Sequence, residues 1–339
     1  MMQPGFHREK IQALFGLMVK VIDEYLAIFP MGGNIDVYPL MHKLAFNIVI
    51  KSLFDIEISV NTMEALGANF DVIQNFIIKD INQPFRRAFY PLTRKDKRVL
   101  AKAGAIKNAF AQIIQQRRQG DKLHNDLLDM LLQSRYEDTG EPMADEQVID
   151  ELLVFMFAGH ETTANTLSWL LYLLSINKPV MDEFAVMVGK MDIYDSHKSD
   201  YLNAVINEAM RLYPAAWLTD RVALSDDGFG EYSYPKGTII ISFFYGAHRN
   251  LNNWEDADVF NPRRFLDENG KLKKIKEFFP FGAGPRLCIG NNFAMAEMCF
   301  FLCRFLQSFS ISPTGQVPLL KPLITLRPDK ILLNIQRKK

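Results

Sequence analysis

The sequence predicts a mainly α-helical fold with a small β portion, an α+β architecture. Two observations predict it. Apolar residues recur at helical spacing through residues 1–213, whereas residues 214–339 contain short β-rich runs bounded by proline and glycine. Of the 339 residues 48% are hydrophobic and 12% aromatic, enough to build a buried core. We expect a single domain over residues 1–339.

The helices of the first part follow from their apolar periodicity. Short polar turns separate the periodic segments. We expect helices at about 15–25, 40–53, 63–78, 93–119, 123–132 and 144–175. The last of these is apolar nearly all round in its middle, which is typical of a central, buried helix. Beyond residue 214, the runs 238–244 and 331–335 predict strands.

The charge balance and the hydropathy of the sequence indicate which partners and which location to expect. Lys+Arg and Asp+Glu are balanced at 39 each, so nothing indicates nucleic acid or an acidic membrane surface as a partner. No apolar run approaches the length of a membrane span, and the N-terminus does not resemble a signal peptide. We therefore expect a cytoplasmic protein with no membrane segment, although an anchor in a preceding portion would change its location. We also expect a monomer.

One cysteine lies in a glycine-rich decapeptide over residues 281–290, Phe-Gly-Ala-Gly-Pro-Arg-Leu-Cys-Ile-Gly. A helix is expected to begin at Cys288, and Arg286 stands two residues before it. The helix N-terminus and the cation should lower the pKa of the thiol, which would then act as a metal ligand or a nucleophile. Gly284 and Gly290 would let the backbone approach a flat partner closely. The alternative is a small buried cysteine in a turn.

The pattern Phe-x-x-Gly-x-Arg-x-Cys-x-Gly resembles the haem-binding loop of the cytochrome P450 family. This resemblance implies that Cys288 is the axial ligand of the iron of haem b. It also implies that Phe281, Gly284, Arg286 and Gly290 contact the cofactor. The other two cysteines, Cys299 and Cys303, share one helical face without histidines at zinc spacing and are expected in the core.

The long helix contains Ala158-Gly159-His160-Glu161-Thr162-Thr163. Glycine in a helix interior is unfavourable by about 1 kcal/mol relative to alanine, so we expect it to make room beside a ligand, together with Ala158. The segment resembles the oxygen-activating helix of the P450 family. That likeness implies that Glu161 and Thr162 are catalytic and supply protons. Alternatively, Thr162 bonds back to its own helix and Glu161 is solvated or paired.

Two further segments resemble the family. Glu208 and Arg211 lie three residues apart on one predicted helix face, and Phe260-Asn261-Pro262-Arg263-Arg264-Phe265 follows downstream. The likeness implies that Arg264 joins Glu208 and Arg211 in a structural triad with no part in the chemistry. Family members often carry glutamate where Arg263 stands.

Arg286 and Arg221 are expected to bind the haem propionates, because a guanidinium matches a carboxylate. Arg221 could instead pair with Asp220 or Asp226, and His248 is a lesser candidate for the same contact. The lysine-rich run over residues 271–276 is either a solvated loop or a docking surface for an electron donor.

The resemblance begins inside the family pattern, so we expect an N-terminally truncated P450-like fold. The missing portion would carry a Trp-x-x-x-Arg motif that binds a propionate. None of the three tryptophans, Trp169, Trp217 and Trp254, lies in such a motif.

The resemblance therefore implies a haem-thiolate monooxygenase that inserts one atom of O2 into an apolar organic substrate. No dinucleotide-binding fingerprint is present, so electrons would come from a separate partner of the ferredoxin, flavodoxin or flavin reductase type. Two alternatives remain open. One is a peroxide-driven haem enzyme, and the other is a truncated, non-catalytic remnant that binds haem weakly or not at all.

Overall fold

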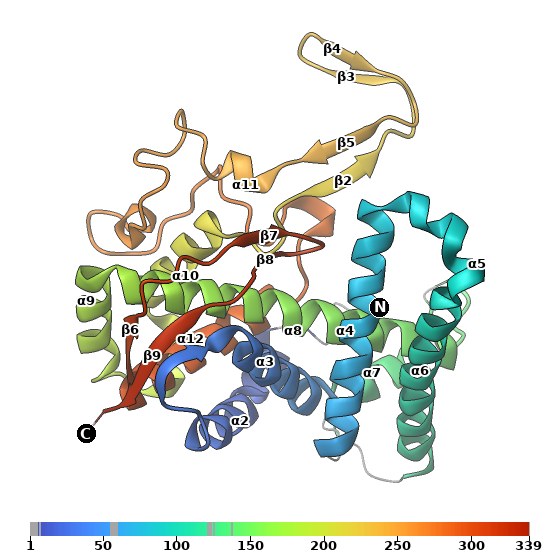
Figure 1. Ribbon diagram of the computed structural model, residues 1–339, viewed down its shortest axis with the longest axis horizontal. Helices are drawn as coiled ribbons and strands as arrows, with labels where there is room; N and C mark the ends of the chain where they lie inside the picture. The colour runs from blue at the N-terminus through green and yellow to red at the C-terminus, as the bar shows by residue number, and fades with distance from the viewer. Residues whose placement is uncertain are drawn as a thin grey trace. The chain divides into compact units, whose positions relative to one another are not determined.

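The computed structural model describes residues 6, 8–54, 60–120, 124, 126–136 and 138–338. The chain forms two compact units, one of residues 1–10 and 47–158 and the other of residues 11–46 and 159–339. Two helices, α3 (Val37–Phe54) and α8 (Asp145–Ile176), run from one unit into the other. The described elements are mainly helical with small sheets (Figure 1), which confirms the predicted fold class.

The first unit is helical. It contains α4 (Val60–Asn82), the short helices η2 (Pro84–Phe89) and α5 (Tyr90–Thr93), α6 (Lys95–Gln119), α7 (Leu127–Gln133) and the first part of α8. Helices α4 and α6 pack against each other. Ile106, Phe110 and Ile114 recur at helical spacing along α6 and are buried, so one apolar stripe holds this helix in place.

Helix α7 begins later than the apolar pattern predicts. The carboxylate of Asp126 accepts a hydrogen bond from the backbone N–H of Asp129 at 2.8 Å and caps the helix at that point. Arg117 of α6 pairs with both carboxylates, at 2.8 Å to Asp126 and 2.5 Å to Asp129. The predicted start of this helix, Leu123, lies outside the described residues.

The second unit is built around α12 (Asn291–Ser308) and the second part of α8. Helix α12 packs against α2 (Phe15–Ala27), α9 (Lys178–Val188) and α10 (Asp200–Leu212). Every residue of α8 from 163 to 171 is buried, which confirms the prediction of a central helix. Cys299 and Cys303 of α12 are buried and free, as expected.

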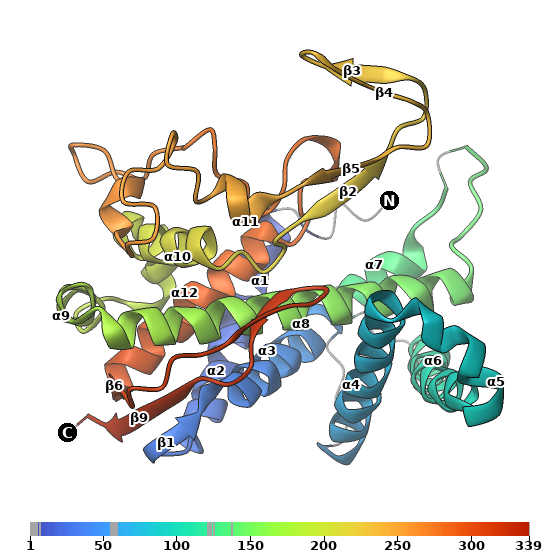
Figure 2. The ribbon, with the colours of Figure 1, turned by 45° about the horizontal axis from the view of Figure 1, so that its top comes forward.

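The strands belong to the second unit and pair antiparallel. The three-stranded sheet has the order β1 (Gly32–Asp36), β9 (Leu332–Arg337), β6 (Phe309–Pro313), and Figure 2 shows β1 and β9 together below α8. Three two-stranded ribbons complete the β portion: β2 (Thr219–Val222) with β5 (Ile239–Ser242), β3 (Asp227–Phe229) with β4 (Tyr232–Tyr234), and β7 (Leu320–Pro322) with β8 (Leu326–Pro328). The predicted strands correspond to β5 and β9.

Candidate active site

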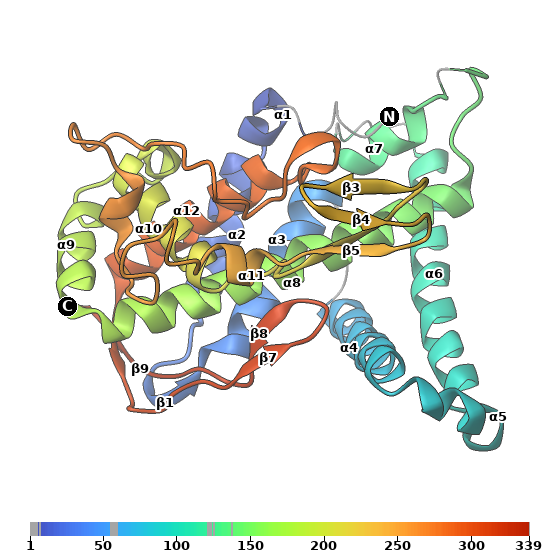
Figure 3. The ribbon, with the colours of Figure 1, turned by 90° about the horizontal axis from the view of Figure 1, so that it is seen from above.

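The loop over residues 281–290 closes on itself before α12 begins (Figure 3, where α12 is labelled). The backbone N–H of Cys288 donates to the carbonyl of Phe281 at 2.9 Å, and the N–H of Leu287 donates to the carbonyl of Gly284 at 3.0 Å. Gly282 and Gly284 have φ angles of 74° and 68°, in the left-handed region that disfavours side chains. The glycines therefore shape the turn that presents Cys288.

The environment of the Cys288 thiol differs from the sequence prediction. Helix α12 starts at Asn291, three positions after the cysteine, so the thiol does not sit on the first turn of the helix. The residue as a whole is exposed, yet protein atoms surround the sulfur enough that desolvation raises the pKa of the thiol. A hydrogen bond from the backbone of Gly290 opposes this rise. The predicted lowering of the pKa is therefore wrong.

The loop fits a flat cofactor that brings its own equatorial ligands. A Cβ atom added at Gly284 or Gly290 would meet no heavy atom within 4 Å, so the backbone borders open space at both positions. Leu287, between them, is 50% exposed. Within the described residues, no group of three or more His, Cys, Asp or Glu side chains could hold a metal ion. The donor set here is a single thiol, which suits one axial bond to haem iron.

The motif of α8 places its acidic residue in the protein interior. Glu161 is buried, and its Oε1 atom accepts a hydrogen bond from Oγ1 of Thr325 at 2.5 Å. Thr162 is half-buried, and its backbone carbonyl accepts from Oγ1 of Thr166 at 3.0 Å. Of the two alternatives for Glu161, solvated or paired, the structure shows a paired carboxylate. Ala158, in the first unit, is exposed.

The neighbouring histidine of the motif packs against rings. His160 lies edge-on to His42 and to Phe46, with ring centroids 5.6 Å apart in each case. This agrees with a packing role for His160.

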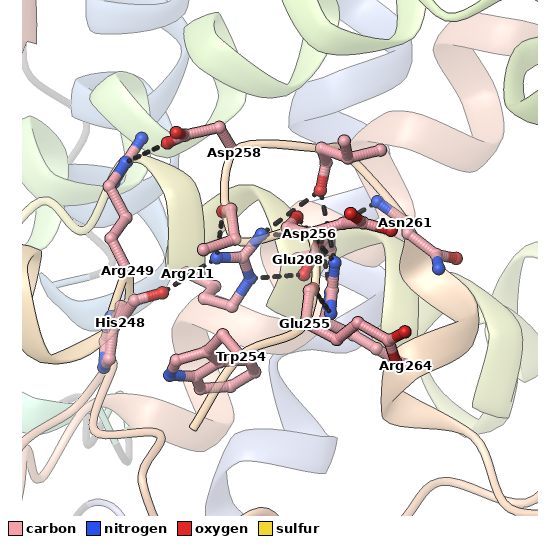
Figure 4. A network of polar contacts seen from close by, with 12 residues as sticks. Glu208, Arg211, His248, Arg249, Trp254, Glu255, Asp256, Asp258, Asn261 and Arg264 are labelled. Carbon is pink, nitrogen blue, oxygen red and sulfur yellow. Dashed lines mark hydrogen bonds and ion pairs between the residues drawn. The ribbon is translucent and has the colours of Figure 1, made fainter. Parts of the chain in front are cut away.

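The structure brings Glu208, Arg211 and Arg264 together (Figure 4). Arg211 is fully buried and donates from Nε to Glu208 Oε2 at 2.8 Å and from Nη2 to Oε1 at 2.9 Å. Arg264 donates from Nε to Oε1 of Glu208 at 3.0 Å. Oε1 also accepts from the backbone N–H of Asn261 at 2.9 Å, so the buried carboxylate is fully bonded.

The third nitrogen of the buried guanidinium, Nη1, holds the chain downstream in place. Arg211 donates from Nη1 to the carbonyls of His248, at 2.8 Å, and Ala257, at 2.7 Å, and it lies 5.1 Å from the centroid of the Trp254 ring. His248 is itself fully buried, and burial lowers its pKa to about 4. Its Nε2 atom accepts from the backbone N–H of Phe279. Nε2 of His248 is therefore already bonded to the protein, and a propionate contact by this side chain stays a prediction.

The two candidate propionate ligands are both exposed. Arg221, on β2, donates to Oγ1 of Thr219 at 3.1 Å and to the backbone carbonyl of Asp220 at 2.6 Å. In these two hydrogen bonds Arg221 contacts neither the Asp220 carboxylate nor the Asp226 carboxylate, the two alternatives predicted from the sequence. Arg286 lies in the single helical turn η5 (Gly284–Arg286), within the cysteine loop.

The sequence analysis missed three polar residues near Glu161. Asn165 is fully buried and donates from Nδ2 to Oγ1 of Thr325 at 2.9 Å. His42 lies beside Asn165; burial, and then the charges of His160 and Arg327, lower the pKa of His42 to about 3, and the contact with Asn165 opposes this shift. Thr325 stands 164 positions from Glu161. No motif joins residues so far apart, so only the fold could reveal them.

Comparison with known proteins identifies the family. A family model described as Cytochrome P450 matches residues 4–335. The chain belongs to the cytochrome P450 family. The P450 is 27% identical over 321 residues to cyclooctat-9-en-7-ol 5-monooxygenase of Streptomyces melanosporofaciens, a match that covers 92% of this chain and 70% of that protein. It is 29% identical over 318 residues to pentalenene oxygenase of Streptomyces avermitilis, with the same two coverages.

A solved structure shares the fold. The heme domain of cytochrome P450DA superimposes with a TM-score of 0.90 and 23% identity, and the match covers 100% of this chain and 76% of that one. The family membership makes the chain an oxidoreductase of the monooxygenase type with haem b as its cofactor. Among its described residues, no helix is long and apolar enough to cross a membrane.

Proposed function

We propose that this P450 uses Cys288 as the axial thiolate of haem b and hydroxylates an apolar small molecule with electrons from a separate protein. The observation that carries the proposal is the loop over residues 281–290. It holds an exposed cysteine on a glycine-shaped turn that borders open space. Bound haem supplies the oxygen chemistry, and the residues of the chain supply the ligand, the orientation and the protons.

The loop residues have separate tasks in binding. The hydrogen bond between the N–H of Cys288 and the carbonyl of Phe281 fixes the direction of the sulfur. The bond from Gly290 stabilises negative charge on it. Arg286 and Arg221 would hold the two propionates, and Arg221 must leave its contacts on β2 to do so.

Glu161 and Thr162 hold and move protons in this proposal. A carboxylate can release a proton and recover it, and a hydroxyl can pass a proton on, so adjacent residues of the two types form a relay. The half-buried Thr162 and the buried Glu161 come from one turn of α8. Glu161 is bonded to Thr325, so a relay requires its side chain to change partner.

The names of two relatives support the proposed substrate class. Two of them are named for cyclooctat-9-en-7-ol and for pentalenene, and both names denote compounds composed mainly of hydrocarbon. We infer an apolar substrate for this chain also. The phenylalanines of the first unit divide between core and surface: Phe70 stacks on Phe157, whereas Phe85 and Phe89 are 69% and 58% exposed.

A separate electron donor fits the surface before the cysteine loop. Lys271, Lys273, Lys274 and Lys276 are all exposed, and Lys271 pairs with Asp200 at 3.2 Å. A cationic surface raises the rate of encounter with an acidic partner such as a ferredoxin or flavodoxin. Reduction by such a donor should slow as salt is added, because ions screen this attraction.

The decisive experiment is the carbon monoxide difference spectrum of the purified, reduced chain. We expect the red-shifted Soret band of a thiolate-ligated haem, and we expect Cys288→Ser to abolish it. Cys303→Ala is the matched control, because it removes a buried cysteine that is not in the loop and should keep the band.

Three results would contradict the proposal. They are a chain that takes up no haem, a band typical of neutral thiol or histidine ligation, and a thiolate band that survives Cys288→Ser. The first would support the non-catalytic remnant. Turnover with peroxide but with no electron donor would instead support the peroxide-driven enzyme.

A further inference from the structure

A chain of hydrogen bonds joins two residues of α8, Asn165 and Glu161, through Thr325, the residue before β8 (Leu326–Pro328). Asn165 donates from Nδ2 to Oγ1 of Thr325 at 2.9 Å, and Thr325 donates from Oγ1 to Oε1 of Glu161 at 2.5 Å. All three side chains are buried: Glu161 is 1% exposed, Asn165 0% and Thr325 5%. All belong to the second unit.

The donor and the acceptor of each of these hydrogen bonds follow from the side-chain groups involved. A threonine hydroxyl has one hydrogen to donate, and here a lone pair already accepts the amide N–H of Asn165. Its hydrogen is therefore free to point at Glu161, which acts as an acceptor. A hydroxyl that donates to a carboxylate oxygen bonds the ionised form of the group more strongly than the neutral form. The arrangement thus stabilises the charged form of a carboxylate in the protein interior.

His42 lies at the Asn165 end of this series of hydrogen bonds and determines how the Asn165 amide is oriented. Within the described residues, neither Nε2 of His42 nor Oδ1 of Asn165 has a geometrically complete hydrogen bond. Burial, and then the charges of His160 and Arg327, lower the pKa of His42 to about 3, and its side-chain contact with Asn165 opposes this shift. An amide whose oxygen faces His42 must present its nitrogen to Thr325, which agrees with the observed bond.

We propose that Thr325, oriented by Asn165, is a positioning residue that keeps Glu161 buried and ionised, ready to take up a proton for the α8 relay. The role of Glu161 in that relay rests on the proposed function, whereas the bond between the two residues does not. Thr325 touches neither the reacting atoms nor the cofactor in this proposal, and it acts only through Glu161.

Infrared difference spectroscopy of the haem-loaded chain tests the idea without turnover. The spectrum of Glu161→Gln minus that of the wild type isolates the bands of this one carboxyl group. We expect carboxylate bands at neutral pH. Thr325→Val keeps the shape of the side chain and loses the hydroxyl, and in that background we expect the ratio of ionised to protonated Glu161 to fall by about tenfold, as for the loss of one hydrogen bond to a charged group.

The control variants separate positioning from packing. Thr325→Ser retains the hydroxyl and should preserve the wild-type bands. Thr314→Val makes the same chemical change where the hydroxyl donates only to the backbone carbonyl of Leu332, at 3.1 Å, and should leave Glu161 unchanged. If Thr325→Val does not fold, Asn165→Ala provides a second test, because it frees the Thr325 hydroxyl to rotate away and should lower the same ratio.

A functional readout accompanies the spectra. With a ferredoxin and ferredoxin reductase as electron donors, Thr325→Val should release more hydrogen peroxide per O2 consumed than the wild type, and Thr325→Ser should not. Unchanged Glu161 bands in Thr325→Val, or equal changes in the valine and serine variants, would overturn the proposal. A chain with the expected bands but no thiolate–haem spectrum would overturn only the proposed function.

Discussion

The Nε2 atom of His248 accepts a hydrogen bond from the backbone N–H of Phe279 at 2.9 Å. The carbonyl of His248 accepts from Nη1 of Arg211, and the carbonyl of Phe279 accepts from the N–H of Gly282, at 3.2 Å. His248 therefore joins the buried ion-pair network of α10 to the start of the cysteine loop. This gives the Glu208–Arg211 pair a physical route by which to position Cys288.

Replacement of His248 by phenylalanine should loosen the cysteine loop. His248→Phe keeps an aromatic ring but leaves the N–H of Phe279 without its acceptor, at a cost of about 1–3 kcal/mol. We expect a smaller share of thiolate-type carbon monoxide complex and a larger share of neutral-thiol complex. His248→Gln retains an acceptor and should restore much of the thiolate signal; equal spectra for wild type and His248→Phe would show that this bond does not position the loop.

The same histidine should make stability depend on pH. Burial, and then the charge of Arg211, lower its pKa from 6.5 to about 4. Between pH 6.5 and 4 the unfolded chain binds the proton and the folded chain does not, so the folded state loses stability as pH falls through this window. The full effect is of the order of 3 kcal/mol.

A difference between two stability curves isolates this contribution. Urea unfolding of wild type and His248→Gln should give free energies whose difference changes by this amount between pH 7 and 4. Glu297 is fully buried, and desolvation raises its pKa, so it contributes a trend of opposite sign. That trend is common to both proteins and cancels. A difference that stays constant with pH would show that His248 titrates normally.

Two arginines offer a direct comparison of buried and exposed ion pairs. Arg211 bonds Glu208 with both side chains 0% exposed, whereas Arg263 bonds Glu183 at 2.6 Å with side chains 67% and 45% exposed. Arg211→Lys removes the bidentate geometry and disrupts the bonds to the carbonyls of His248, Ala257 and Val259, so we expect a loss of about 3–5 kcal/mol in unfolding free energy. Arg263→Lys should change it by about 0–1 kcal/mol. Similar values for both variants would mean that burial does not strengthen the network.

The sequence predicted the parts of this protein that depend on local pattern. The periodicity of residues 144–175 gave the bounds of α8 to within one residue at each end, and the spacing of Glu208 and Arg211 placed both on one face of α10. It could not show that β1 joins β9, because Gly32 and Ile335 are brought together only by tertiary packing. The contact of Thr325 with Glu161 could not be predicted for the same reason.

The error at Cys288 has a different physical cause. The prediction of a lowered pKa assumed that the helix begins at the cysteine, but α12 begins at Asn291. Two extra loop residues move the thiol away from the first turn, where the effect of the helix dipole is concentrated. Desolvation then determines the direction of the shift. Sequence patterns locate helix ends only to within a few residues. At Cys288 an error of three residues in the helix start led to the wrong direction for the pKa shift.

The shape of the cysteine loop should depend on glycine at position 284. A Cβ there would meet no heavy atom within 4 Å, so Gly284→Ala creates no clash with the protein, but its φ of 68° is unfavourable for alanine by about 1–2 kcal/mol. We expect the free energy of urea unfolding to fall by this amount. We also expect faster transfer of haem to an acceptor such as apomyoglobin, because a methyl group would project into the space that the loop borders. Gly104→Ala is the matched control: it lies inside α6, also without a clash, and should stabilise the chain by about 0.5–1 kcal/mol. If Gly284→Ala destabilised the chain as expected but released haem at the wild-type rate, the open side of this glycine would not face the cofactor.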